Sequence, residues 1–120
     1  MTATQSSTYE NDVNKFGAGN CIDGNTDSDR GPDGRFAICH TNGDATPWVA
    51  IDYGTSVTVQ RVEIFNRGGA GQRTRNVDVR ISNMLPTSGS QMFSGGTLLG
   101  HFAGPAVNGQ VIIISGQMEL

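Results

Sequence analysis

Residues 40–73 read HTNGDATPWVAIDYGTSVTVQRVEIFNRGGAGQR, and this stretch decides the fold. It starts with His40 in a polar loop, continues through two β-rich segments, and ends in a glycine-rich loop flanked by Arg67 and Arg73. Rigid strands commonly hold functional residues on the loops that connect them. We therefore expect the histidine and the two arginines to meet at one end of a β-sandwich, where they would form a small polar pocket.

The alternation of apolar and polar residues predicts the strands. Residues 76–82 (NVDVRIS) alternate most clearly, with the valines and the isoleucine facing inward. Within residues 57–66 the apolar phase switches at Gln60 and Arg61, which predicts a β-bulge. A run that is apolar on both faces, residues 110–115, predicts a central strand. With further strands expected at residues 3–7, 48–54 and 97–102, the pattern indicates an all-β jelly-roll sandwich.

Length and composition point to a single domain, residues 1–120. The chain has 17 glycines, only 16% charged residues and a formal net charge of −3, as expected for an all-β protein rich in turns. It has no basic cluster, which argues against nucleic acid as a partner. No apolar run approaches the roughly 20 residues of a membrane span, so we expect a soluble chain. Met1 leads directly into polar residues and shows no signal peptide, which does not exclude a removed leader.

Cys21 and Cys39 leave two alternatives open. They can form one disulfide that closes a loop of modest length, which would suit an oxidising, extracellular compartment. They can equally be two reduced thiols in the core.

The stretch NCIDGNTDSDRGPDGR, residues 20–35, is rich in oxygen donors. Calcium takes about six to eight oxygens from carboxylates, amides and backbone carbonyls. The EF-hand pattern is not met, because the twelfth position counted from Asp23 is Gly34 instead of glutamate. A calcium loop and a solvated acidic loop both remain open. The oxygen donors are Asn20, Asp23, Asn25, Asp27, Asp29 and Asp33.

Arg67 and Arg73 face each other across glycines, and their planar forks can donate several hydrogen bonds to a vicinal diol or an anion. His40 adds a group that can accept as well as donate. For Arg75 and Arg80 we expect surface ion pairs. Tyr9 is expected to pack over the edge of the core.

The sequence resembles the F-type lectins, the fucose-binding relatives of the discoidin or coagulation-factor type C domains. The resemblance rests on ATQSSTY, NCIDGNTD, ICHTN with TPWVAIDYG, VTVQRVEIFNR and NVDVRIS. It implies a galactose-binding-domain-like jelly roll and a pocket for L-fucose or fucosylated glycans. The family's histidine and two basic residues correspond to His40, Arg67 and Arg73, with Arg75 as an alternative to Arg73. Tyr9 and Phe36 are the candidates for the pocket of the sugar methyl group.

The chain departs from the family pattern in the glycine-rich loop. Gly69 stands where the family has an aspartate after the first arginine, and the vicinal cysteines of some members are absent, with Ala70 nearby.

The same resemblance implies a structural calcium ion. The family's cation loop corresponds to Asn20, Asp23 and Asn25. Another family ligand is a backbone oxygen before the histidine, which corresponds to Ala37, and Glu119 is the candidate for the acidic ligand in the last strand. The terminal strands look shortened relative to the family. A shortened pair would expose a sheet edge that favours a homo-oligomer.

The residues also bear on two other function classes. A discoidin-like module would bind lipid head groups or protein through apolar tips in the 84–93 loop. An enzyme is not expected, because the neighbours Cys39 and His40 would point to opposite faces of a strand, and no carboxylate pair for glycoside hydrolysis stands out.

Overall fold

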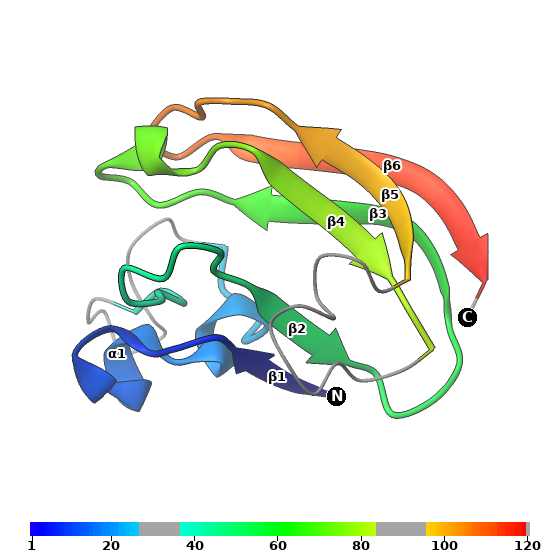
Figure 1. The fold of residues 1–120 in the computed structure, drawn as a ribbon, viewed down its shortest axis with the longest axis horizontal. Coiled ribbons are helices and arrows are strands. Elements are labelled where there is room, and N and C mark those ends of the chain that lie inside the picture. Colours follow the sequence, from blue (N-terminus) through cyan, green and yellow to red (C-terminus); the bar gives the residue numbers. More distant parts are fainter. Residues whose placement is uncertain (27–36, 84–95, 120) are drawn as a thin grey trace. The chain divides into compact units, whose positions relative to one another are not determined.

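The computed structural model describes residues 1–26, 37–83 and 96–119, with side chains in the last strand described as far as Gly116. The chain divides into two compact units, Met1–Gly54 and Thr55–Leu120 (Figure 1).

The first unit is built on one antiparallel ladder between β1 (Thr2–Gln5) and β2 (Val49–Asp52). Three short helical segments, which were not predicted from the sequence, follow β1. They are η1 (Tyr9–Asn11), α1 (Val13–Phe16) and η2 (Ala18–Cys21). Asp12 explains the start of α1, because its side chain accepts a hydrogen bond from the Lys15 N–H, as an N-cap residue does.

A disulfide joins Cys21, at the end of η2, to Cys39. The disulfide alternative is therefore confirmed and the reduced-thiol alternative is wrong. Two backbone hydrogen bonds support the same connection, since Ile38 N–H donates to Lys15 O and His40 N–H donates to Phe16 O, at 2.9 and 3.0 Å. The residue before His40 is thus tied covalently to the helical segments.

The second unit contains two antiparallel ladders. One pairs β3 (Thr58–Phe65) with β6 (Val111–Glu119), and the other pairs β4 (Val77–Ile81) with β5 (Thr97–Phe102). Figure 1 shows β5 running beside β6, and these strands pack on each other. The core of this unit consists of Ala106, Ile112 and Ile114, against which Ile64, Val79, Leu99 and Phe102 pack.

The predicted bulge in β3 is confirmed. The β3–β6 register shifts between Val59 and Arg61, and the half-buried positions change from Val59 to Val62 and Ile64 across the shift. On β6 the residues opposite are Met118 and Ser115, so β6 accommodates one more residue than β3 there.

The prediction for the last strand is only partly right. β6 continues beyond residues 110–115 to Glu119, and among the described residues it is hydrogen-bonded to β3 alone. Ile112 and Ile114 are buried, whereas Val111 and Ile113 are 44% and 57% exposed. The expectation of a central strand is wrong, because the second apolar face of β6 is not covered by the described residues.

Candidate functional site

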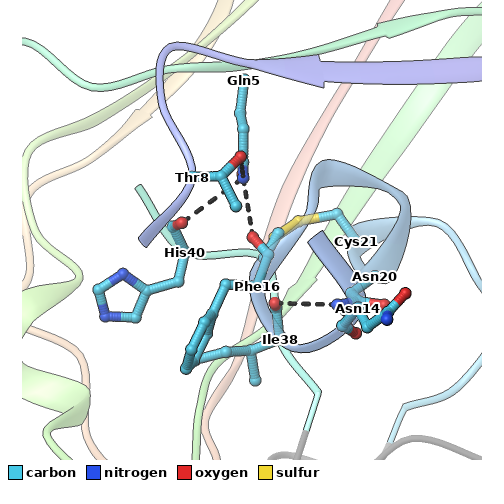
Figure 2. Close-up of a disulfide and its surroundings, with 9 residues drawn as sticks. Gln5, Thr8, Asn14, Phe16, Asn20, Cys21, Ile38 and His40 are labelled. Carbon is cyan, nitrogen blue, oxygen red and sulfur yellow. Dashed lines mark hydrogen bonds between the residues drawn. A yellow bond between two sulfur atoms is a disulfide. The ribbon is translucent and has the colours of Figure 1, made fainter. Parts of the chain in front are cut away.

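His40 lies in a cluster of three rings in the first unit. Its ring centroid is 4.5 Å from that of Tyr9 and 5.5 Å from that of Phe16, and Tyr9 and Phe16 meet edge to face at 5.1 Å. The backbone fixes this arrangement, because Tyr9 N–H donates to His40 O and His40 N–H donates to Phe16 O. Gln5 Nε2 reinforces it by donating to Phe16 O at 2.8 Å (Figure 2).

The imidazole of His40 is held by its own chain. Nδ1 lies 2.5 Å from the carbonyl oxygen of Thr41. A carbonyl oxygen can only accept, so Nδ1 carries the proton, and Nε2 of the neutral ring remains an acceptor. The side chain is half-buried, and Figure 2 shows its ring directed away from the disulfide.

A polar cluster holds the loop that follows His40. Asp44 Oδ2 accepts hydrogen bonds from the hydroxyls of Ser6 and Ser7, at 2.7 and 2.6 Å. These hydroxyl oxygens in turn accept from the backbone N–H groups of Trp48 and Asn42, at 3.2 and 2.8 Å. The hydrogen bonds that the hydroxyls of Ser7 and Ser6 donate stabilise the ionised carboxylate, and they hold the pKa of Asp44 below its ordinary value. The cluster is therefore stable above the usual carboxyl pKa and is lost only as the pH falls through that lowered value.

The glycine-rich loop of the second unit is organised by Asn66, which is 4% exposed. Its Nδ2 donates to Gly71 O and Val107 O, at 3.0 and 2.9 Å, and its Oδ1 accepts from the Thr74 hydroxyl at 2.7 Å. Its backbone N–H donates to Gln110 O. One buried amide therefore forms hydrogen bonds with two backbone carbonyls and one hydroxyl, and it connects the beginning of residues 66–74 to their end.

Arg67 and Arg73 both belong to this loop. Arg67 is half-buried, and Arg73 is exposed at the end of η3 (Gly71–Arg73). Ala70 precedes η3 in the left-handed region with φ of 53°. Gly71 is required by space, since a Cβ there would lie 2.7 Å from the backbone nitrogen of Asn108.

The structure thus places the predicted sugar-binding residues in two groups. His40 and Tyr9 lie against each other in the first unit, and Arg67 and Arg73 share one loop of the second unit. The union of both groups in one pocket stays a prediction. Phe36 lies outside the described residues.

Three of the predicted calcium ligands lie close together in sequence, Asn20 within η2 and Asp23 and Asn25 after it. Asn20 Nδ2 donates to the carbonyls of Asn14 and Ile38, both at 3.2 Å, which orients its amide. Asp23 Oδ1 accepts from Asn25 N–H at 2.9 Å. Amide and carboxylate oxygens are the donors that calcium prefers, so the chemistry of these residues fits the ion.

The other two predicted ligands are not tested by side-chain geometry. Ala37 could offer only its backbone oxygen, and the side chain of Glu119 lies outside the described part of the chain, as do Asp27, Asp29 and Asp33. Among the described residues, no group of three histidine, cysteine or acidic side chains could hold a metal ion.

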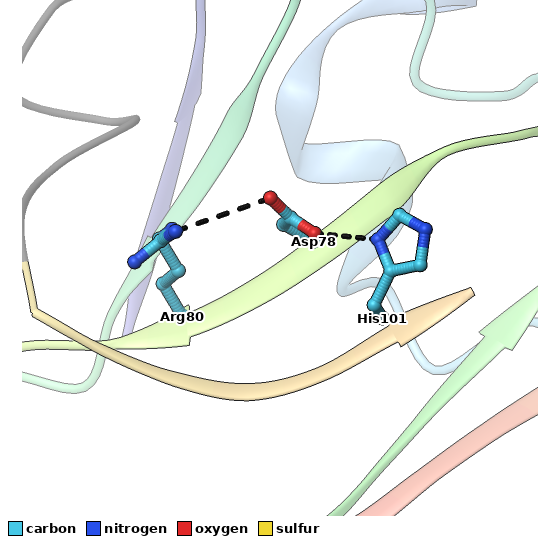
Figure 3. Close-up of polar contacts among 3 residues, drawn as sticks. All are labelled: Asp78, Arg80 and His101. Atoms are coloured by element: carbon cyan, nitrogen blue, oxygen red, sulfur yellow. Dashed lines mark hydrogen bonds and ion pairs between the residues drawn. The ribbon is translucent and has the colours of Figure 1, made fainter. Parts of the chain in front are cut away.

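A second polar cluster lies on the β4–β5 ladder (Figure 3). His101 Nδ1 contacts Asp78 Oδ1 at 2.6 Å, and an Arg80 guanidinium nitrogen lies 4.0 Å from Asp78 Oδ2. The expected ion pair of Arg80 is confirmed. Arg75 is exposed, and the described residues offer it no ion pair.

Sequence reasoning missed Asn66, Asp44 and the two serines. A signal was present, because Ser, Asn and Asp beside loops commonly bond to nearby backbone groups. Their partners are up to 42 residues away, as for Ser6 and Trp48, and no local pattern encodes such a distance.

Comparisons with known proteins place the chain in a family. The family model for the NedA-like, galactose-binding domain of the F5/F8 type C group matches residues 20–97, which is more than half of the chain. The chain is also similar to the crystal structure of an F-lectin (fucolectin) from the serum of striped bass, Morone saxatilis. That match has a TM-score of 0.79 and 28% identity, and it covers 99% of this chain and 38% of the fucolectin chain.

No curated protein matches the sequence. In the described parts of the chain, every helix is too short to cross a membrane. The matches confirm the predicted resemblance and the predicted all-β, galactose-binding-domain-like fold. Domains of this kind are binding modules without catalysis, in agreement with the prediction of a non-enzyme. The chain belongs to the family of NedA-like, galactose-binding domains of the F5/F8 type C group.

Proposed function

We propose that the protein is a lectin that binds L-fucose or fucosylated glycans through His40, Arg67 and Arg73. The observation that carries this proposal is the presentation of His40. Its Nδ1 is engaged by Thr41, no described residue forms a hydrogen bond with its Nε2, and its ring lies against the 39%-exposed Tyr9. The similarity to a fucolectin supports the choice of sugar.

The chemistry of the two groups is complementary to a 6-deoxy sugar. His40 Nε2 can accept from a sugar hydroxyl, and the guanidinium groups of Arg67 and Arg73 can donate to hydroxyl and ring oxygens. The exposed ring of Tyr9 offers an apolar surface to the methyl group. The missing aspartate at Gly69 does not leave the loop without support, because Asn66 fixes its backbone.

The affinity for the monosaccharide should be low. About eleven heavy atoms at roughly 0.3 to 0.5 kcal/mol each give a Kd of about 0.1 to 10 mM. Binding to cell-surface glycans would then depend on several sites acting together, and a homo-oligomer would supply them.

Calcium and an extracellular location belong to the same proposal. The ion would be held near Asn20, Asp23 and Asn25 and would order the loop that precedes His40. The disulfide and the serum origin of the similar fucolectin support secretion.

Retention on immobilised fucose tests the proposal. Arg67→Ala should abolish retention, because a donor to the sugar is removed from a loop position, and the circular dichroism spectrum should be unchanged. Arg61→Ala is the matched control, since Arg61 pairs with Glu63 at 2.9 Å on β3 and is no proposed sugar contact. Normal retention of the Arg67 variant would contradict the pocket assignment.

Liposome binding distinguishes the discoidin-like alternative. The residues proposed as its loop tips, Met84, Leu85, Met92 and Phe93, lie outside the described residues. Binding to vesicles of phosphatidylserine and phosphatidylcholine that persists in His40→Ala would favour a lipid-binding module over a lectin.

A further inference from the structure

A continuous series of hydrogen bonds connects Asp44 to the imidazole of His40. Ser7 Oγ lies 2.6 Å from Asp44 Oδ2, and Asn42 N–H donates to Ser7 Oγ at 2.8 Å. The peptide group to which that N–H belongs also contains the carbonyl of Thr41. This carbonyl accepts from His40 Nδ1. One peptide unit therefore bonds the imidazole at one end and the serine hydroxyl at the other.

The carboxylate fixes the direction of the hydroxyl bond, whereas the backbone N–H can only donate and the backbone carbonyl can only accept. An ionised carboxylate can only accept, so the Ser7 hydroxyl must donate to Asp44 and use its lone pair for Asn42 N–H. The bond from Asn42 N–H to Ser7 increases the dipole of the Thr41–Asn42 peptide group. The Thr41 carbonyl oxygen thereby carries more negative charge and is a better acceptor for His40 Nδ1–H. Hydrogen bonds in series strengthen one another in this way.

We propose that Asp44 is a positioning residue for His40. Acting through Ser7 and the Thr41–Asn42 peptide, it strengthens the Thr41 carbonyl as the acceptor that holds the imidazole in the Nδ1–H tautomer, and so leaves Nε2 as the acceptor for a ligand hydroxyl. The identity of that ligand rests on the proposed function, whereas the tautomer is a property of the protein alone. Neutral imidazole in water favours the Nε2–H tautomer, so the series reverses the intrinsic preference.

Ser6 supplies a matched control within the same cluster. Its hydroxyl donates to the same Asp44 oxygen at 2.7 Å, but it accepts from Trp48 N–H and has no bond to the Thr41–Asn42 peptide. Ser6→Ala and Ser7→Ala therefore each remove one hydroxyl from the same carboxylate. Only the Ser7 change interrupts the path to His40.

Nitrogen-15 NMR of the histidine rings, at about pH 8 where imidazole is neutral, tests the proposal without any sugar. The chain has two histidines, and His101 serves as the internal reference. We expect Nδ1–H at His40 in the unmodified protein and in Ser6→Ala. Ser7→Ala should shift His40 toward Nε2–H, Asp44→Asn should shift it less, and Ser7→Thr, which keeps the hydroxyl, should restore it.

The fucose affinity gives the second readout. Ser7→Ala should weaken fucose binding by about threefold to tenfold, the value of one hydrogen bond, with Ser6→Ala near the unmodified affinity. The fluorescence of Trp48, the single tryptophan, reports whether the cluster still holds the loop. An unchanged His40 tautomer in Ser7→Ala, or an equal shift in Ser6→Ala, would overturn the proposal. A shifted tautomer in a protein that never binds fucose would support the positioning role and refute the lectin.

Discussion

At the scale of single residues, a few polar side chains fix the backbone of both candidate binding loops. Asn66 does so for the arginine loop, since its amide satisfies two carbonyls and one hydroxyl inside the unit. Asp44 does so for the histidine loop through two serines. The loops that carry the proposed sugar-binding residues are therefore held by side chains that do not belong to the predicted motif.

Asn66→Asp should destabilise the protein while keeping the side chain's size. The substitution replaces the donating NH2 by an oxygen, so the carbonyls of Gly71 and Val107 lose their partner and face a carboxyl group. We expect the free energy of unfolding to fall by about 1–3 kcal/mol, measured by urea denaturation. The exposed Asn83→Asp should change it by less than about 0.5 kcal/mol. Equal effects of the two substitutions would show that the Asn66 network does not stabilise the loop.

Single residues were predicted unevenly from the sequence. His40, Arg67 and Arg73 could be singled out because residue type and spacing match a family motif. The placement of Tyr9 over the core's edge is consistent with its contact to Phe16, and its second contact, with His40, also fits the sugar-pocket reading. Asn66 and Asp44 could not be predicted, because their roles depend on partners distant in sequence.

At the scale of elements, periodicity predicted the strands well and the helical segments poorly. The alternation in residues 76–82 and the phase switch in β3 correspond to observed features, because side chains alternate between faces of a strand. The segments η1, α1 and η2 are three or four residues long, too short for a helical period to show. β6 was expected to be central because it is apolar on both faces, yet sequence alone cannot say whether both faces are covered.

Removal of the disulfide should cost much of the stability of the first unit. Cys21 and Cys39 are 18 residues apart, and closing a loop of that size contributes about 3 kcal/mol. The double variant Cys21→Ser/Cys39→Ser should lose about that much free energy of unfolding in guanidinium denaturation. Addition of reductant should lower the midpoint of the unmodified protein and leave the double variant unaffected. A midpoint insensitive to both changes would mean that the bond adds nothing to stability.

Chelation tests the calcium proposal at the end of η2 and the residues that follow it. If Asn20, Asp23 and Asn25 bind the ion, calcium stabilises the folded state by mass action, and EDTA should lower the melting temperature. Asp23→Asn removes one ligand charge and should reduce the calcium-dependent part of the shift. The same melting temperature with calcium and with EDTA would favour the alternative interpretation of residues 20–35 as a solvated acidic loop.

At the scale of the whole molecule, the family and the fold class were predictable from the sequence, and the single-domain prediction stays a prediction. The motifs that resemble the F-type lectins extend over most of the sequence, and the similar fucolectin structure covers 99% of it. Along the chain, the first compact unit ends at Gly54 and the second begins at Thr55. Local periodicity carries no information on how strands group into compact units.

The single-domain prediction requires one cooperative unfolding transition. Trp48 lies in the first unit, whereas four of the six strands in the described part of the chain lie in the second. Tryptophan fluorescence and circular dichroism therefore report on different parts of the chain. Coincident melting curves are expected for one domain, and separated midpoints would show that the units unfold independently.

The central claim is that the chain binds fucose, and calorimetric titration with L-fucose in the presence of calcium tests it most directly. D-galactose serves as the control sugar. The account predicts saturable heat with L-fucose, with a Kd of about 0.1 to 10 mM, and none with D-galactose. The absence of heat with millimolar L-fucose would contradict it.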